Sequence, residues 1–162
     1  MCNKNNQKLY IEWSRSHLKK RTKLLEIMAY SQWVVVKIVS ENMTLKVQNA
    51  KLDYGKFYKK DNKDHTISIA DINKITIASG KIDYVCSCGR SGSSTGTEGR
   101  FELFEGDTKI GEFGWDCPYW KKTNHFNWTQ VEATKKTYST NMEGGNKDSG
   151  AIGNITITCV KI

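Results

Sequence analysis

Apolar and polar residues alternate with a period of two along much of the chain after residue 30. In 43–48, Met43, Leu45 and Val47 alternate with polar residues, which is typical of a strand that buries one face. The same alternation recurs in five further segments: Ile67 and Ile69; Ile75 and Ile77; Ile82, Tyr84 and Cys86; Phe101 and Leu103; Ile155, Ile157 and Cys159.

Residues 30–38 form a nearly continuous apolar run instead, and this predicts a strand buried on both faces. Turn signals rich in Gly, Asp and Asn separate the expected strands, at 53–55, 61–64, 105–107 and 144–148. The chain has a single proline and no strong helical pattern after residue 27. We therefore predict an all-β protein in which residues 28–162 form a single-domain β-sandwich.

Residues 1–27 differ from this body because they hold seven basic residues against two acidic ones, so they carry most of the net charge of +8. They are helical in character, with Leu18, Leu24, Leu25 and Ile27 among lysines and arginines. Two interpretations stay open. The segment is either a basic amphipathic helix that touches anionic lipid, or a tail or extension upstream of a native start at Met28.

The remaining 135 residues carry a net charge of only +3, and this argues against a nucleic-acid partner, because such a domain concentrates Lys and Arg on its folded body. The hydrophobic fraction of 38% indicates a soluble globular protein. No apolar run approaches the roughly 18–20 residues that a membrane-spanning helix needs. Any contact with a membrane is therefore expected from outside or through a partner.

The five cysteines make an odd count: Cys2, Cys86, Cys88, Cys117 and Cys159. Cys86 and Cys88 would lie on one face of a strand, but their spacing does not match that of common zinc sites. We expect buried free thiols, with one disulfide as the alternative, and no metal or other cofactor. The three histidines lack neighbours that would form a nucleophile site, so we expect no enzymatic activity.

The glycine-rich segment 89–99 looks at first like a phosphate-binding loop, but it lacks the Gly-Lys-Ser/Thr ending and leads into an expected strand. It is either a long hairpin connection, or a loop in which Arg90 and backbone N–H groups meet an anionic headgroup.

The segment 115–124 combines aromatic rings, two lysines and the only proline, in the order Trp-Asp-Cys-Pro-Tyr-Trp-Lys-Lys-Thr-Asn. Amphipathic rings beside lysines suit a water–lipid boundary. Proline restricts its own backbone and that of the preceding residue, so a held loop is expected here. This composition points to recognition at a surface.

Together these segments resemble the aegerolysin family over 28–162. The resemblance rests on Met28-Ala29-Tyr30-Ser31-Gln32-Trp33, Cys88-Gly89-Arg90-Ser91, the run Gly96 to Leu103, Trp115-Asp116-Cys117-Pro118, Lys122-Thr123-Asn124 and the run Asp148 to Gly153.

The resemblance implies an actinoporin-like β-sandwich that is released without a classical signal peptide and binds lipid at the surface of target-cell membranes. It implies sphingomyelin with cholesterol, or ceramide phosphoethanolamine, as the lipid class. It also implies a pore-forming partner of the membrane-attack-complex/perforin type, with haemolytic or, among bacterial relatives, insecticidal action.

The resemblance further implies a lipid site at an interfacial pocket. Its residues are Trp33, Tyr54, Trp115, Tyr119 and Trp120, with Thr95 in the glycine-rich loop and Lys122 or Arg90 on the lipid phosphate. Tyr54 and Tyr119 stand where relatives often carry tryptophan, Trp120 replaces a small residue, and Thr95 replaces the acidic residue of sphingomyelin–cholesterol binders. Tyr119 and Trp120 are expected to be exposed because they follow a proline in a loop. Trp33 and Trp115 belong either to the pocket or to the core. The alternative function is a non-lytic module that binds a carbohydrate or protein receptor.

Overall fold

The structure is a computed structural model that describes residues 10–21, 30–120 and 123–162. Eleven strands, one short α-helix and one 3-10 helix follow residue 30 in the described residues. The strands are β1 (Trp33–Glu41), β2 (Leu45–Tyr54), β3 (Lys56–Lys59), β4 (Asn62–Ile67), β5 (Thr76–Ile77), β6 (Lys81–Cys88), β7 (Thr97–Glu105), β8 (Thr108–Cys117), β9 (His125–Gln130), β10 (Tyr138–Gly144) and β11 (Gly153–Lys161). The helices are α2 (Ile69–Ile72) and η1 (Glu132–Thr134).

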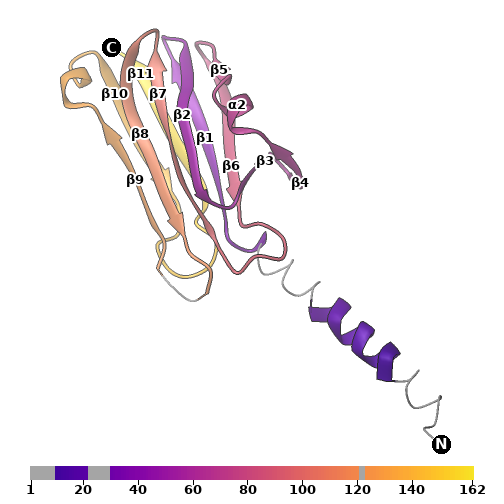
Figure 1. Cartoon of the computed structure of the whole chain (residues 1–162). Helices are drawn as coiled ribbons and strands as arrows, with labels where there is room; N and C mark the ends of the chain where they lie inside the picture. Colours follow the sequence, from indigo (N-terminus) through magenta and orange to yellow (C-terminus); the bar gives the residue numbers. More distant parts are fainter. Residues whose placement is uncertain (1–9, 22–29, 121–122) are drawn as a thin grey trace, which may run out of the picture.

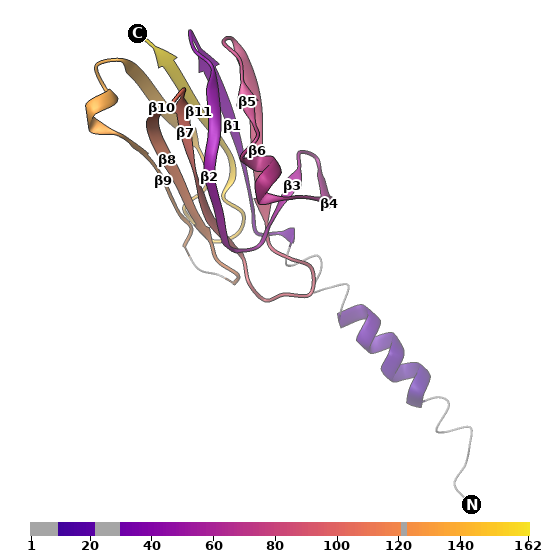
Figure 2. The ribbon, with the colours of Figure 1, turned by 45° about the horizontal axis from the view of Figure 1, so that its top comes forward.

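Two sheets pack face to face, as Figures 1 and 2 show from two directions. One sheet has the strand order β10-β11-β1-β6-β3-β4, and the other has the order β5-β2-β7-β8-β9. Every neighbouring pair is antiparallel except β1 and β11, which run parallel. The predicted β-sandwich is confirmed.

The core lies between the sheets and is built by the alternation seen in the sequence. Leu45 and Val47 of β2, Phe101 and Leu103 of β7, and Ile155 of β11 are all buried in it. Burying large apolar side chains on one face of each strand provides the main driving force for folding.

Strand β1 corrects one prediction, because the apolar run at 30–38 is not buried on both faces. Val34, Val36 and Ile38 point into the core, whereas Trp33 and Val35 are half-buried on the outer face of their sheet. The outer face is apolar here because Trp33 and Val35 pack there against a second, smaller cluster formed by Tyr58, Cys86 and Cys88.

Residues 68–72 correct a second prediction, in which Ile67 and Ile69 were assigned to one strand. The strand ends at Ile67, and α2 begins at Ile69. Ser68 ends the strand because its hydroxyl accepts a hydrogen bond from the backbone N–H of Asp71 at 3.1 Å, which caps the helix. Such local caps compete with strand pairing.

The glycine-rich segment is not a hairpin connection, which excludes one of the two alternatives left open for it. It joins β6 of the six-stranded sheet to β7 of the five-stranded sheet, so it crosses from one layer to the other. A second crossing lies beside it, where Gly55 joins β2 to β3. Gly55 has a φ of +92°, which side chains rarely adopt.

Residues 10–21 are helical, in agreement with the helical character expected of the N-terminal segment. All their side chains are exposed except that of Ser14, which is half-buried. No helix among the described residues is both long and apolar enough to span a bilayer.

Candidate functional site

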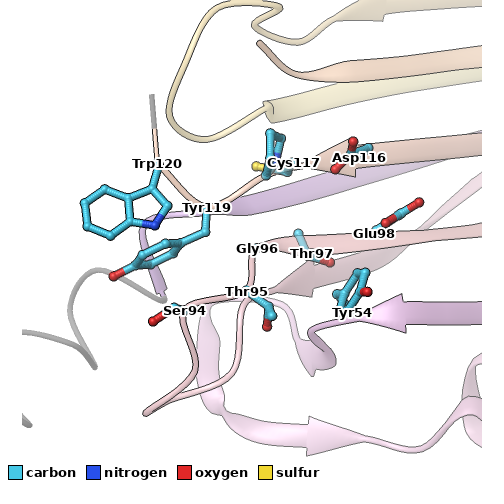
Figure 3. A pocket seen from close by; sticks show the side chains of 11 residues that line it. Tyr54, Ser94, Thr95, Gly96, Thr97, Glu98, Asp116, Cys117, Tyr119 and Trp120 are labelled. Atoms are coloured by element: carbon cyan, nitrogen blue, oxygen red, sulfur yellow. The ribbon is translucent and has the colours of Figure 1, made fainter. Parts of the chain in front are cut away.

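A hollow of about 230 Å³ opens where the two crossings and the end of β8 meet (Figure 3). The side chains of Tyr119 and Trp120 lie at one end of it in Figure 3, and those of Tyr54 and Glu98 lie toward the other. We call it the aromatic hollow, and it is lined by Tyr54, Ser94, Thr95, Gly96, Thr97, Glu98, Asp116, Cys117, Pro118, Tyr119 and Trp120.

Strand register brings these residues together. Thr97 pairs with Cys117, and Glu98 pairs with Asp116, at the end of the β7–β8 ladder. Gly96 lets the crossing loop lie against β8, because a Cβ atom at this position would overlap the carbonyl oxygen of Cys117. The glycine therefore sets how closely the two walls of the hollow approach.

Trp115 lies beneath the hollow and is only 3% exposed, so its ring belongs to the core and not to the pocket lining. Its indole N–H donates to the Thr97 hydroxyl at 3.1 Å, and the hydroxyl groups of Thr97 and Ser87 lie 2.6 Å apart. This chain of bonds joins β8, β7 and β6 behind the hollow and satisfies three buried polar groups. Trp115 supports the floor of the site.

Tyr119 corrects a prediction of exposure, since it is only 6% exposed while Trp120 is 65% exposed. The two rings pack edge to face, with centroids 5.1 Å apart and an interplanar angle of 85°. Trp120 has a φ of +78°, a left-handed conformation that is unfavourable for a bulky residue. The backbone thus holds the Trp120 ring outward over Tyr119.

Two carboxylates border the same hollow, and sequence analysis did not identify them. Burial, followed by the negative charges of Asp116 and Asp53, raises the pKa of Glu98 above its ordinary value. Glu98 and Asp116 are separated by 18 positions in the sequence, so only the β7–β8 register could have revealed that they are neighbours. The hollow therefore offers negative charge beside aromatic rings.

Arg90 lies in an adjoining hollow of about 500 Å³, which Tyr54 and Thr95 also line. Its Nε–H donates to the carbonyl oxygen of Gly55 at 2.8 Å, and this bond fixes one edge of the guanidinium. Within the described part of the chain, Arg90 takes part in no salt bridge. Its terminal nitrogens can therefore act as a fork for an anion.

Trp33 lies elsewhere, on the outer face of the six-stranded sheet. The ammonium group of Lys63 sits 5.0 Å from its ring centroid, and both residues line a separate hollow of about 570 Å³. The structure thus brings Tyr54, Thr95, Tyr119 and Trp120 together, places Arg90 next to them and separates Trp33 from them. Lys122 lies outside the described residues.

The four described cysteines, Cys86, Cys88, Cys117 and Cys159, are buried and free, so the alternative of a disulfide among them is wrong. Across residues 10–21, 30–120 and 123–162, no group of His, Cys, Asp or Glu is arranged to hold a metal ion.

Comparison with known proteins places the chain in a family. The family model described as Aegerolysin matches residues 31–162. Asp-hemolysin of Aspergillus fumigatus is 41% identical over 136 residues, which cover 83% of this chain and 96% of the relative. Ostreolysin A6 of Pleurotus ostreatus is 34% identical, with coverage of 83% and 98%.

A solved structure shares the fold. The crystal structure of IP-1A from Alcaligenes faecalis matches with a TM-score of 0.79 and 40% identity, covering 84% of this chain and 95% of that one. The family match spans the whole sandwich, including both crossings and the aromatic hollow. The chain therefore belongs to the aegerolysin family.

Proposed function

We propose that this protein is the lipid-binding component of a cytolytic toxin and that the aromatic hollow recognises the headgroup of a sphingolipid. Membership of a family with relatives named hemolysin and ostreolysin supports a role related to cytolysis. Choline and ethanolamine headgroups carry a positive charge next to a phosphate, so their site must provide both a cation-binding part and an anion-binding part.

The main support is the combination of Tyr54, Tyr119 and Trp120 with Glu98 and Asp116 around one hollow. Aromatic faces attract quaternary ammonium groups, and carboxylates add direct charge attraction. The raised pKa of Glu98 reflects negative charge held at a partly desolvated position, and a bound cation would relieve that repulsion.

The phosphate is assigned to the Arg90 side. Tyr54 and Thr95 line both hollows, so a headgroup can place its cation in the aromatic hollow and its phosphate toward Arg90. A guanidinium fork suits the paired oxygens of a phosphate. Lys122 follows the aromatic pair in the sequence and stays a second candidate for the same phosphate.

The pore itself is assigned to a partner. We propose that the bound protein recruits a membrane-attack-complex/perforin-type protein that inserts into the bilayer, and that cell lysis follows at the target-cell surface. No catalytic role is proposed. Insecticidal use and release without a classical signal peptide remain predictions from the family resemblance.

Arg90→Gln and Arg100→Gln test this assignment, because they remove the same charge at different places. Arg100 is exposed on β7 and lines none of the three hollows described above. We expect Arg90→Gln to weaken binding to sphingomyelin–cholesterol vesicles about tenfold, through loss of a charge-assisted hydrogen bond, while Arg100→Gln changes it less than about twofold.

Vesicle sedimentation measures the binding, and thermal unfolding verifies that both variants fold. Equal weakening by the two substitutions would reduce the effect to net charge and contradict the Arg90 assignment. Failure of the unmodified protein to sediment with either sphingomyelin–cholesterol or ceramide phosphoethanolamine–cholesterol vesicles would contradict the lipid function itself.

A further inference from the structure

The helix at residues 10–21 has two chemically distinct faces. An α-helix turns once in about 3.6 residues, so positions three and four apart share a face. Tyr10, Trp13, Ser14, His17 and Leu18 follow this spacing along one side, and Ile11 lies beside them. The opposite side is polar and carries Glu12, Arg15 and Lys19. Ser16 and Lys20 lie at the border near Trp13, and Arg21 ends the apolar side.

The large apolar side chains of this helix face solvent. Trp13 is 58% exposed, Tyr10 and Leu18 are more exposed still, and none of them belongs to either core cluster of the sandwich. The Tyr10 and Trp13 rings stack with centroids 6.3 Å apart, and the rings of Trp13 and His17 lie 4.0 Å apart. The apolar side thus carries a contiguous row of rings, which a water-exposed helix does not need.

Charge decides what covers this row. Residues 10–21 hold four basic residues against one acidic residue. The sandwich from residue 28 onward is also net basic, so a second copy of the body would repel this helix. Anionic lipid attracts it, and Trp and Tyr rings suit the interface between headgroups and acyl chains.

We infer that the helix at residues 10–21 is a second membrane contact, which lies in the plane of an anionic leaflet with Tyr10, Trp13 and Leu18 toward the acyl chains. A helix this short is marginally stable in water and gains stability at the interface. Because it is tethered to the sandwich, it raises the overall affinity of a protein already bound through the aromatic hollow.

Three variants of the full chain separate the effect of the face from that of composition. Trp13→Gln removes the central ring, and Ser16→Gln introduces the same side chain at the border of the row, where no ring is lost. The double exchange Trp13→Lys with Lys19→Trp keeps composition and charge and moves the ring to the polar side. Sedimentation is measured with sphingomyelin–cholesterol vesicles, with and without added phosphatidylserine.

We expect phosphatidylserine to strengthen binding of the unmodified protein about tenfold. Ser16→Gln should keep this gain, whereas Trp13→Gln and the exchange should lose most of it and still bind vesicles that lack phosphatidylserine. An equal gain in all variants, or none in the unmodified protein, would overturn the inference. So would self-association of the protein without lipid that Trp13→Gln abolishes, because a second copy would then cover the row. Failure of the unmodified protein to bind vesicles without phosphatidylserine would instead count against the aromatic hollow.

Discussion

Trp120 combines wide exposure with a backbone conformation that favours glycine. Its φ of +78° places the side chain in the left-handed region, which costs a bulky residue on the order of 1 kcal/mol. A glycine at this position would adopt that conformation without strain. The strain persists here together with a ring that is held in solvent beside the aromatic hollow, and we attribute it to lipid binding.

Trp120→Gly and Trp120→Ala test this reading, since both remove the ring but only glycine relieves the strain. We expect Trp120→Gly to be more stable than Trp120→Ala by about 1 kcal/mol in urea unfolding, and both to bind sphingolipid vesicles several-fold more weakly. Full vesicle binding by both folded variants would exclude a role for the ring.

Glu98 gives the site a pH dependence. The pKa of Glu98 is raised in the folded protein, so folding favours the protonated form of this side chain. As the pH rises through the raised pKa, Glu98 becomes charged and the folded state loses stability. A cationic headgroup needs the charged form. Vesicle binding should therefore weaken as the pH falls from neutral through the raised pKa of Glu98.

Glu98→Gln should remove most of this pH dependence, lower affinity at neutral pH and slightly raise stability there, because the unfavourable charge is gone. Sedimentation and thermal unfolding across the same pH series measure both effects. Unchanged pH dependence in the variant would show that Glu98 does not face the ligand.

For single residues, the sequence indicated which aromatic side chains lie at or near the site, but it did not indicate which of them are buried. Tyr119 and Trp120 are adjacent and both follow a proline, yet one is buried and the other exposed. Trp115 is held in the core by a hydrogen bond to Thr97, a partner distant in sequence. Such burial depends on tertiary packing, which neither composition nor periodicity shows.

Among the elements, the crossing from β6 to β7 matters most for the site. It carries Ser94, Thr95 and Gly96 to the end of β8, where they complete the aromatic hollow. The alternation of apolar residues predicted most strands, because it directly records which face is buried. This alternation contains no information on which sheet a strand joins, so it could not show whether the glycine-rich segment between β6 and β7 is a hairpin or crosses between the sheets.

Gly96→Ala and Gly114→Ala compare a glycine that lines the aromatic hollow with a glycine of β8 that does not. A methyl group at Gly96 would meet the backbone of Cys117, whereas at Gly114 the nearest atom would be 3.8 Å away. We expect Gly96→Ala to lower the free energy of unfolding by about 1–3 kcal/mol and to weaken vesicle binding, and Gly114→Ala to change it by less than about 0.5 kcal/mol. Similar urea midpoints for the two variants would contradict the close approach at Gly96.

For the molecule as a whole, burial makes the cysteines unreactive. Burial raises the pKa of Cys86 and Cys159 to about 12, and that of Cys88 and Cys117 to about 11. Cys2 lies outside the described residues. Its state is therefore open to direct measurement.

A colorimetric disulfide reagent at mildly alkaline pH should modify at most Cys2 in the native protein and all five cysteines after denaturation. Cys2→Ser should then leave the native protein without a reactive thiol. Rapid reaction of two or more thiols in the native chain would contradict the packing of the sandwich.

The β-sandwich and the family were both predictable, because strand alternation and several ordered motifs span the body. The basic N-terminal segment, the net-basic sandwich and the aromatic hollow all support the claim that the protein recognises membrane lipid. Whether the protein binds a lipid or a carbohydrate or protein receptor must be tested on the whole molecule, because no single residue decides it.

Sedimentation of the full chain with protein-free vesicles tests that claim most directly. Vesicles of phosphatidylcholine alone are compared with vesicles that add cholesterol and either sphingomyelin or ceramide phosphoethanolamine, and dye release is followed in each. We predict selective sedimentation with one or both sphingolipid vesicles and no leakage without a partner protein. Equal sedimentation with all vesicles would contradict sphingolipid recognition. No sedimentation with any vesicle would also contradict it, and would favour a carbohydrate or protein receptor.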